Sequence, residues 1–515
     1  MAQSTFYVDD NAPGDPAPGD PGLGDAAEDG SVAHPFDSIQ EAIIASVSGD
    51  TVEVLDGTYG GDGNTDLDFG GRLITLRSRN GPDNCGNCGG DARAFIFHTG
   101  ESSAAVVSGF TIQNGHARLS GPFGGGEEDR PPDDYGGGIY SFDTSVVIEN
   151  CVIRDCEAER DGGGIYLRKG SPTIRGCTIQ NNSADRAGAG IRSEESTPTI
   201  EGCMILNNVT GVEGGRGAGI SCDGGAAVAD GCNITDNRAR FGGAAGIFLG
   251  AGGRMIDCVV HSNSCADNSE GGIGSRGDVR LERCKITENN AIDGAGVFHA
   301  SGRLTVVNCI IARNRGVNHY DDASGAAIEF RDPVVVINST IMDNGAAANA
   351  GSGGISQLEG AGEHLTMVNS IVWDLDSVTI PTGASIEYSC VMGGWEGTGN
   401  IDSDPNFVDA EGGDYHLFDV SPCINSGSND VQGLPETDID GDNRLQGGNV
   451  DMGAFESAFA SPGVPCDEGC TFKLGEWLAS LCGQGMAQSL TACVVLACGG
   501  MLARAHRRRP RSPLP

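Results

Sequence analysis

Lysine is nearly missing from this sequence, since Lys169, Lys285 and Lys473 are the only ones among 515 residues. Acidic residues number 71 against 32 lysines and arginines, so the formal net charge at pH 7 is −39. A surface of this sign repels polyanions, which argues against nucleic acid and anionic membranes as partners. The charge fits a soluble exported protein and is compatible with calcium binding.

Aromatic residues make up only 5% of the sequence, and the central region has no sustained helical period of 3.6 residues. Its core must therefore consist of small aliphatic side chains on elements that are not helices. Glycine is abundant, with 83 residues, but it recurs at fixed places in a long repeat. Collagen-like triplets are thereby excluded.

The repeat is clearest in residues 162–184, GGGIYLRKGSPTIRGCTIQNNSA, and residues 188–210, GAGIRSEESTPTIEGCMILNNVT. Each unit contains a glycine-rich start, an Ile, an apolar-x-x-Cys-x-Ile segment and an Asn. Alternation with period two predicts short strands with one buried face, and clusters of Asn, Gly and Asp predict turns. The unit is therefore roughly three short strands, one rung of a solenoid that buries its face against its neighbours.

One cysteine recurs in each unit, at intervals of 25 to 29 residues, and Ser339 and Ser370 continue the series. Stacked Cα atoms lie ~4.8 Å apart, and parallel Cβ vectors keep the Cβ atoms beyond the usual disulfide distance. We expect buried free thiols, with metal binding as a weaker alternative, at Cys151, Cys177, Cys203, Cys232, Cys258, Cys284 and Cys309.

An asparagine recurs five residues after this position. Its place in the turn predicts a ladder in which each amide bonds the neighbours above and below. Glycosylation or ligand contact is the alternative for these residues, which are Asn182, Asn208, Asn237, Asn263, Asn289, Asn314 and Asn344.

The text Gly-Gly/Ala-Gly-Ile and Cys-x-Ile-x-x-Asn-x-Ala, as in CTIQNNSADRAGAGI, resembles the pectin-lyase-like superfamily and is closest in wording to polymorphic outer-membrane-protein repeats. The resemblance implies an all-β fold, a single-stranded right-handed parallel β-helix of roughly 10–13 rungs. We expect a cap over 1–50, the β-helix over 51–400, a closing segment over 401–456 and a tail over 457–515.

The N-terminal region reads as strand FYVDD, helix DSIQEAIIAS and strand TVEVLDGTY, which is similar to the cap of secreted bacterial β-helix proteins. Capping-box spacing joins Asp37 to Gln40 or Ser38 to Glu41. MAQSTFYVDD shows neither the charged nor the apolar part of a signal peptide. We expect that the start is trimmed or mis-assigned and that the protein is extracellular or anchored at the cell surface.

Residues 401–456 resemble the closing segment called a choice-of-anchor domain, in the motifs at Ser421–Gly427, Asp438–Arg444 and Val450–Glu456. Asp438, Asp440 and Asp442 also resemble the first half of a calcium loop, but its bidentate Glu is missing. An Asp-rich turn is the favoured interpretation, and a calcium site is the alternative.

The tail contains an uncharged stretch, 477–503, followed by an arginine cluster. Its length suffices to cross a bilayer, and the positive-inside rule would leave the arginines in the cytoplasm. The order resembles a bacterial C-terminal sorting signal, and a soluble cysteine-containing tail is the alternative. Any membrane contact would come through this tail, and we expect a monomer.

The superfamily resemblance implies a polysaccharide groove along one parallel sheet. The residue after the glycine-rich Ile points outward, and aromatic rings occupy it at Tyr140, Tyr166, Phe248 and Phe298. Tyr140 and Tyr166 are expected to stack as a platform for a sugar ring, or merely to cover the sheet. Charged residues are spread along the rungs, and no rung concentrates an Asp pair with a base.

Two insertions, 121–135 and 315–325, interrupt the repeat, and insertions in solenoids often carry function. The second contains His319, Asp321 and Asp322, a weak candidate for acid/base catalysis or metal binding. The insertions lie six or seven rungs apart, about 30 Å, so they cannot form one site.

Two function classes follow. The first is a non-catalytic surface protein, adhesin-like or glycan-binding. The second is a lyase or glycoside hydrolase that acts on an anionic polysaccharide along the groove. Asp and Arg side chains that meet across three neighbouring rungs would favour the enzyme, and an even, shallow face would favour the binding protein.

Overall fold

The chain divides into two compact units, Met1–Pro462 and Gly463–Pro515. The computed structural model describes only residues of the first unit, namely 3–9, 28–88, 90, 92–118, 134–211, 215–240, 242–266, 270–292, 294–316, 327–346, 354–358, 365–373 and 380–458.

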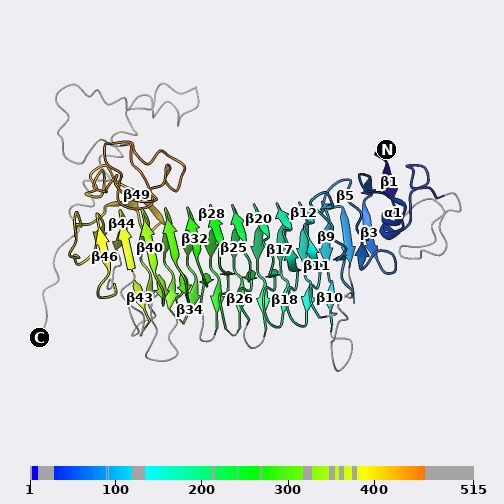
Figure 1. Ribbon diagram of the computed structural model, residues 1–515, viewed down its shortest axis with the longest axis horizontal. Helices are drawn as coiled ribbons and strands as arrows, with labels where there is room; N and C mark the ends of the chain where they lie inside the picture. Colours follow the sequence, from blue (N-terminus) through cyan, green and yellow to red (C-terminus); the bar gives the residue numbers. More distant parts are fainter. Residues whose placement is uncertain are drawn as a thin grey trace, which may run out of the picture. The chain divides into compact units, whose positions relative to one another are not determined.

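Most of the described strands of the first unit stack into four parallel sheets, which we number in the order that a rung visits them (Figure 1). Sheet I follows the glycine-rich element, and its 11 strands are β4 (Leu67–Asp68), β7 (Phe95–Phe97), β11 (Ile139–Thr144), β15 (Ile165–Gly170), β19 (Ile191–Glu194), β23 (Ile220–Asp223), β27 (Ile247–Leu249), β31 (Ile273–Ser275), β35 (Val297–His299), β39 (Ile328–Phe330) and β43 (Ile355–Gln357).

Sheet II is the longest. Its 14 strands are β1 (Thr5–Val8), β2 (Thr51–Val54), β5 (Thr75–Ser78), β8 (Val106–Ser108), β12 (Val147–Glu149), β16 (Thr173–Arg175), β20 (Thr199–Glu201), β24 (Val228–Asp230), β28 (Arg254–Ile256), β32 (Val279–Glu282), β36 (Leu304–Val307), β40 (Val334–Ile337), β44 (Leu365–Val368) and β46 (Ser385–Glu387).

Sheet III follows the recurring cysteine. Its 13 strands are β3 (Gly57–Gly60), β6 (Cys85–Cys88), β9 (Thr111–Gln113), β13 (Val152–Arg154), β17 (Thr178–Gln180), β21 (Met204–Leu206), β25 (Asn233–Thr235), β29 (Val259–His261), β33 (Lys285–Thr287), β37 (Ile310–Ala312), β41 (Thr340–Met342), β45 (Ile371–Trp373) and β47 (Cys390–Val391).

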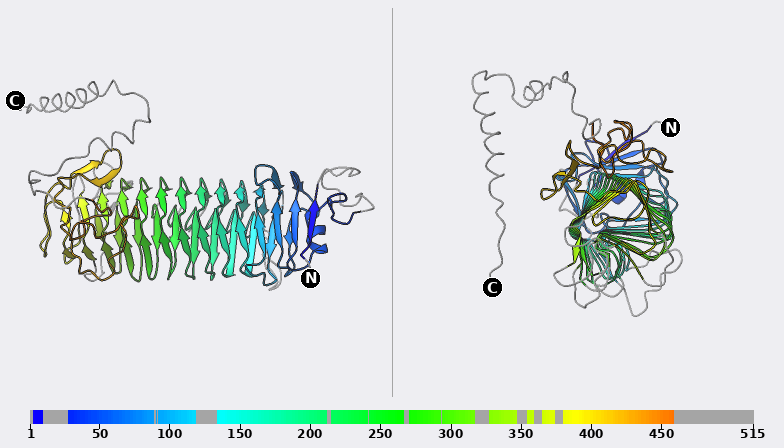
Figure 2. Two further views of the ribbon diagram at one scale, coloured as in Figure 1. Left: turned by 90° about the horizontal axis from the view of Figure 1, so that it is seen from above. Right: turned by 90° about the vertical axis from the view of Figure 1, so that its left-hand side faces the viewer.

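Sheet IV consists of two-residue strands that follow the recurring asparagine. Its nine strands are β10 (His116–Ala117), β14 (Glu157–Ala158), β18 (Ser183–Ala184), β22 (Val209–Thr210), β26 (Arg238–Ala239), β30 (Ser264–Cys265), β34 (Asn290–Ala291), β38 (Arg315–Gly316) and β42 (Gly345–Ala346). The predicted all-β parallel solenoid is confirmed, and Figure 2 shows its rungs from above and along the axis.

The interior of the solenoid is filled by in-register rows of small side chains. Ile153, Ile179, Ile205 and Ile234 pair with one another along sheet III, and all are fully buried. The same position of successive rungs holds the same residue, so the side chains form a continuous row along the axis. This arrangement explains why a chain so poor in aromatic residues has a continuous core.

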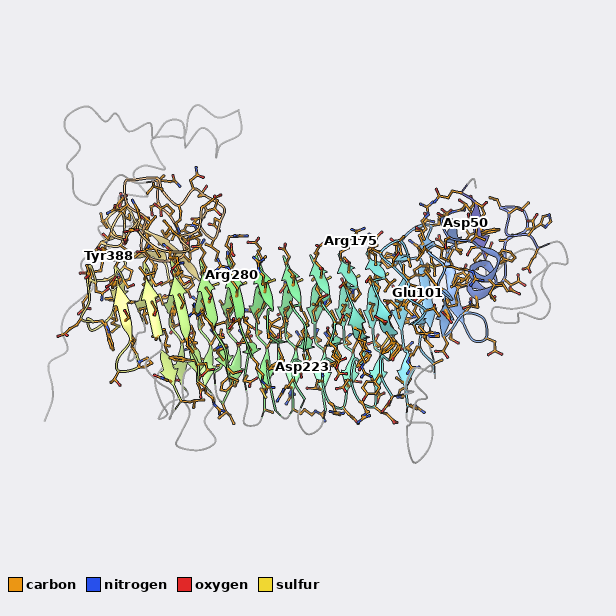
Figure 3. All side chains as sticks on the ribbon, in the orientation of Figure 1. Asp50, Glu101, Arg175, Asp223, Arg280 and Tyr388 are labelled. Carbon is orange, nitrogen blue, oxygen red and sulfur yellow. The ribbon has the colours of Figure 1, made fainter. Side chains whose placement is uncertain are left out.

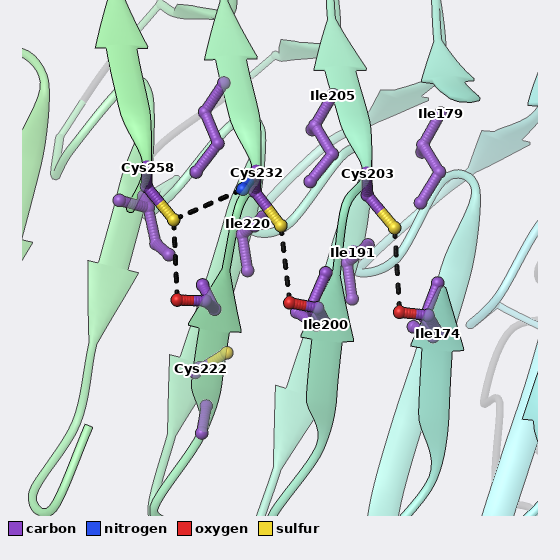
Figure 4. Close-up of a cluster of buried hydrophobic side chains, with 14 of the residues drawn as sticks. Ile174, Ile179, Ile191, Ile200, Cys203, Ile205, Ile220, Cys222, Cys232 and Cys258 are labelled. Atoms are coloured by element: carbon purple, nitrogen blue, oxygen red, sulfur yellow. Dashed lines mark hydrogen bonds between the residues drawn. The ribbon is translucent and has the colours of Figure 1, made fainter. Parts of the chain in front are cut away.

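The recurring cysteines form a row beside these isoleucines (Figure 4). The thiol of Cys232 donates to the carbonyl of Ile200, and its backbone N–H donates to the sulfur of Cys258 at 3.4 Å. At Ser339 a hydroxyl takes the place of the thiol and accepts the N–H of Cys309 at 3.1 Å. Every cysteine whose side chain the structure describes is a free, buried thiol.

The recurring asparagines form a buried ladder at the turn between sheets III and IV. The side-chain amide of Asn208 donates to Oδ1 of Asn237 and to the carbonyl of Ile179, both at 3.0 Å. The backbone N–H of Asn208 also donates to Oδ1 of Asn237, and the pattern continues to Asn344. These bonds satisfy backbone groups that the tight turn removes from the sheets.

A strand and a helix close the N-terminal end of the stack. Strand β1 pairs in parallel with β2, and helix α1 (Ile39–Ala45) buries Ile39, Ala42 and Ile43 beside it. Of the two capping-box pairs, the one that begins with Ser38 forms, because its hydroxyl accepts the N–H of Glu41 and donates to the Glu41 carboxylate. This cover protects the first sheet edge.

Residues 401–458 leave the stack and lie along the side of the last rungs (Figure 1). Within them, β48 (Phe407–Asp409) and β49 (Asp414–Leu417) form an antiparallel hairpin. Asn308, Asn338 and Asn369 bond this segment through their side-chain amides. Each occupies the left-handed backbone position between sheets II and III.

Candidate functional site

The outward row of sheet I, the expected platform for a sugar ring, is covered. Tyr140, Tyr166 and Phe248 are each only 3% exposed, and Phe298 is half-buried. The rings of Tyr140 and Tyr166 do stack on neighbouring rungs, with centroids 5.6 Å apart and an interplanar angle of 12°. Of the two interpretations of these rings, the structure agrees with the one in which they stack and cover the sheet.

The cover comes from side chains at the turn that leads from sheet IV to the next strand of sheet I, which we call the variable corner. Tyr135 contacts the ring of Tyr166, and the guanidinium of Arg216 lies 5.1 Å from the ring centroid of Phe248. Arg331, which directly follows strand β39, lies over the ring of Phe298. Arginine readily covers aromatic faces in this way.

Between the covered tyrosines and Phe248 the face opens into a charged pocket of about 410 Å³. The outward residue here is the small Ser221, and the described part of the next corner contributes Gly242 and Gly243 to the lining. We define the charged pocket by its polar lining residues, Asp161, Arg186, Arg192, Arg216, Asp223 and Glu270.

Arg192 lies at the centre of the charged pocket. Its guanidinium donates to Ser221 at 2.8 Å and to Glu194 at 2.7 Å, and it lies 4.0 Å from Asp223. Its Nε is buried and has no hydrogen-bond partner among the described residues. Burial opposes its charge, but Glu194, Asp161 and Asp223 outweigh burial and raise the pKa of Arg192.

Two carboxyl groups of this region have opposite pKa shifts. Burial raises the pKa of Asp161, one of whose oxygens accepts the N–H of Ala187 at 2.9 Å. Burial also opposes ionisation of Glu194, but a hydrogen bond from the Tyr166 hydroxyl at 2.5 Å and the charge of Arg192 lower its pKa. Environments that move two carboxyl pKa values apart are typical of acid/base pairs.

Asp223 is the exposed carboxylate of the charged pocket. It pairs in register with Glu194 on the neighbouring strand, and Arg192 contacts both carboxylates. On its other side Arg216 approaches Asp223 to 4.0 Å. Figure 3 shows Asp223 on a different sheet from Arg175. Three neighbouring rungs thus bring Asp, Glu and Arg side chains together.

Most of the charged pocket escapes the sequence pattern. Asp161, Arg186, Arg216 and Glu270 all belong to variable corners, which differ in length between rungs. Asp161 and Ala187 each stand directly before a glycine-rich element, and the two residues pair in a β-bridge. An alignment of the units on this position would have placed them side by side. That alignment is the signal that could have revealed the pocket.

The weak candidates His319, Asp321 and Asp322 lie outside the described residues. The described strands place both insertions at variable corners, one between β10 and β11 and the other between β38 and β39. Seven steps along sheet IV separate the two, so at ~4.8 Å per step they do not share a site.

The aspartates at 438, 440 and 442 form a turn. Asp438 is buried, and its Oδ1 accepts the N–H groups of Asp440 and Asp442, both at 2.9 Å, while Oδ2 accepts that of Glu456. Backbone donors thus use both oxygens of the first expected calcium ligand. Across the described part of the chain, no group of His, Cys, Asp and Glu has an arrangement suited to a metal ion.

Membrane contact was expected through 477–503, which lies outside the described residues. None of the helices in the described ranges is both long and apolar enough to cross a membrane.

Several solved structures resemble this chain. A pectate lyase, Pel9A, matches at 16% identity over 88% of this chain and 97% of its own, with a TM-score of 0.43. XylC in complex with xylose matches at 11% identity over 89% and 99%, with a TM-score of 0.46. The A-module of the Azotobacter vinelandii mannuronan C-5 epimerase AlgE4 matches at 14% identity over 74% and 98%, with a TM-score of 0.34.

No curated protein matches the sequence. A family model described as "Right handed beta helix region" matches residues 94–239 and 218–390, which together exceed half of the chain. The parallel stack seen in the structure agrees with that description, as does the predicted handedness. This chain therefore belongs to the right-handed beta helix family.

Proposed function

We propose that this protein binds a polysaccharide at the charged pocket and acts as a glycan-binding protein outside the cell. The observation that carries the proposal is the meeting of Arg192, Arg216 and Asp223 beside a gap in the cover of sheet I. Arginine and carboxylate side chains offer donors and acceptors to sugar hydroxyls, and Arg192 Nε has no hydrogen-bond partner among the described residues.

Glycan affinity measured with the full chain tests this proposal. On an array of polysaccharides, Asp223→Asn and Arg216→Gln should each weaken the best interaction about tenfold, the cost of one charge-assisted bond. Arg175→Gln is the matched control, because Arg175 is exposed on sheet II and pairs with Glu149 there. Equal losses for all three variants, or no bound glycan, would overturn the proposal.

Glycoside hydrolysis is the second candidate, and the opposite pKa shifts of Asp161 and Glu194 favour it. Asp161 would serve as the general acid, and Glu194 as the ionised partner. A lyase reaction has less support here, because the carboxylates around Arg192 stabilise its charged form and the pocket lining includes no lysine.

Release of reducing sugar ends distinguishes hydrolysis from binding alone. If the pocket is hydrolytic, the full chain releases such ends from a polysaccharide that it binds, and Asp161→Asn removes the activity while binding persists. A rise in ultraviolet absorption from unsaturated ends would instead reveal a lyase. Tight binding with neither signal leaves the glycan-binding proposal in place and excludes hydrolysis of that polysaccharide.

The proposed location outside the cell and the monomeric state are supported by the acidic surface and by the resemblances of the N-terminal region and of residues 401–456. Cell fractionation, combined with protease treatment of intact cells, tests the location. Light scattering of the purified chain tests the monomeric state.

A further inference from the structure

Cys390 is a cysteine of the solenoid that does not belong to the inward ladder. Ser389 occupies the ladder position of its rung, because the Ser389 hydroxyl accepts the N–H of Ser370 as Ser339 accepts that of Cys309. Cys390 begins β47, and the next residue, Val391, belongs to the interior core. Side chains alternate along a strand, so the thiol of Cys390 points out of the solenoid.

Cys423 comes to the same place from the segment 401–458, which covers this end of sheet III. Its backbone is held there, because its carbonyl accepts the N–H of Met452 at 3.0 Å and its N–H donates to the Ser421 hydroxyl at 3.2 Å. Both cysteines are 0% exposed. They belong to one buried cluster outside the solenoid, made of Ile371, Cys390, Leu417, Cys423, Ile424 and Met452.

The thiols of Cys390 and Cys423 interact directly across the contact between the two segments. A hydrogen bond between them, followed by burial, raises the pKa of the Cys423 thiol well above its ordinary value. The Cys390 thiol also donates to the carbonyl of Ser403 at 3.2 Å. Two sulfur atoms in hydrogen-bond contact thus lie on segments that are far apart in the sequence, one in the solenoid and one in its cover.

Cysteines of the ladder also lie next to one another, but their geometry is different. Cys232 and Cys258 occupy the same position of successive rungs, so their Cα atoms lie about 4.8 Å apart with parallel Cβ vectors. Their Cβ atoms therefore stay beyond the separation of roughly 3.5–4.5 Å that a disulfide needs. Cys390 and Cys423 share no sheet, so no common register imposes this restriction on them.

We propose that Cys390 and Cys423 are a cross-linking site, at which a disulfide joins the segment 401–458 to the last described rung. The oxidant is a low-molecular-weight disulfide. Cys423 loses its proton to water, and its thiolate attacks one sulfur of the oxidant and releases the first thiolate. Cys390 then loses its proton, attacks the mixed disulfide and releases the second. The protein gives up two protons and two electrons, and the electrons reduce the oxidant to two thiolates.

The reaction requires local opening of the segment 401–458, because both thiols are buried and the raised pKa of Cys423 keeps its thiolate scarce. Once formed, the disulfide closes the loop between positions 390 and 423 and restricts further opening. Oxidising conditions prevail outside the cell, the location proposed above, whereas glutathione keeps cytosolic thiols reduced. The cross-link does not depend on the glycan-binding function.

Peptide mapping of the full chain tests the cross-link. Reduced protein is incubated with oxidised glutathione, in buffer and in urea below the unfolding transition, where the segment opens locally. Remaining thiols are blocked with iodoacetamide in denaturant before digestion and mass spectrometry. Most of Cys390 and Cys423 should appear in one linked peptide pair, and the ladder cysteines should be blocked. Recovery of Cys390 and Cys423 as blocked thiols under both conditions, or in disulfides with other cysteines, would overturn the proposal.

Hydrogen exchange then tests what the cross-link does. Exchange in β48 and β49 should be at least about tenfold slower in the oxidised protein than in the reduced protein. Cys390→Ala should abolish this difference. Cys222→Ala is the matched control, because it also removes a buried free thiol, from β23 of sheet I, and should keep the difference. Equal exchange in the two redox states of the unaltered protein would contradict a cross-link that holds this segment.

Discussion

At the scale of single residues, stability depends on side chains that repeat a bond from rung to rung. Within the ladder, an asparagine such as Asn237 accepts two N–H groups of one neighbouring asparagine and donates to the next. Isoleucine rows contribute burial alone, but the ladder also fixes the turn between sheets III and IV. One asparagine therefore serves the backbone of two rungs.

Asn237→Ala should destabilise the protein by about 1–3 kcal/mol, the cost of leaving buried polar groups unpaired. The substitution removes the acceptor for Asn208 and the donor to the carbonyl of Ile205. Thermal unfolding followed by circular dichroism measures the loss. Asn233→Ala, at an exposed position of β25, is the control and should change the midpoint little. Equal shifts for both would refute a special role of the ladder.

Much of the repeating structure can be predicted at this scale, because in-register stacking places equivalent residues on top of one another. The cysteine and asparagine rows follow from spacing alone. The charged pocket does not follow, because Asp161 and Arg216 come from corners of unequal length. Burial of Tyr166 depends on Tyr135, a residue of the corner, and the period of the strands does not describe the corner.

At the scale of elements, the segment 401–458 acts as a brace for the last rungs. Arg444 is 1% exposed and donates to the carbonyls of Gly453, Ala454 and Phe455. It also contacts Asn308 of the solenoid. The motif that suggested an anchor thus has an internal structural role in the described part of the chain.

Arg444→Met should detach this brace, because the carbonyls that Arg444 now serves would be buried without a donor. Hydrogen exchange should rise in β36, β40 and β44 by at least about tenfold, while β17 and β21 keep their protection. Arg175→Met, which alters an exposed ion pair, provides the comparison. A uniform change along the whole solenoid would contradict a local brace.

The brace should also respond to pH through Glu456. Burial raises the pKa of Glu456 to about 7, so ionising it in the folded protein costs free energy. That cost is absent below the ordinary pKa of about 4.3 and complete above about 7, so stability falls as pH rises through this window.

Glu456→Gln has no such cost. The difference between its unfolding midpoint and that of the unaltered protein should therefore grow from pH 5 to pH 8. Each kcal/mol of the avoided cost corresponds to about 2 °C. Asp419→Asn, at an exposed position of the same segment, should show no such trend. The opposite outcome is that the two midpoints differ by the same amount at pH 5 and at pH 8. That result would show that Glu456 does not titrate in this range.

At the scale of the whole molecule, repulsion between its many carboxylates lowers the stability of the stacked rungs. The formal charge of −39 is spread over a solenoid whose rungs lie about 4.8 Å apart, so like charges on neighbouring rungs lie well within a Debye length at low salt. Pairs such as Arg77 with Glu53 and Arg283 with Asp257 offset this locally, by bonding one rung to the next. With 71 acidic and 32 basic residues, most carboxylates have no such partner available.

Salt should therefore stabilise the folded chain. Screening shortens the Debye length from about 30 Å at 0.01 M to about 8 Å at 0.15 M, which weakens repulsion between rungs more than it weakens contacts at 3 Å or below. The unfolding midpoint should rise over this interval in sodium chloride and then level off. Sucrose at equal osmolality is the control for preferential exclusion. A midpoint that falls with salt would contradict this prediction. It would mean that the ion pairs between rungs stabilise the fold more than repulsion between carboxylates destabilises it.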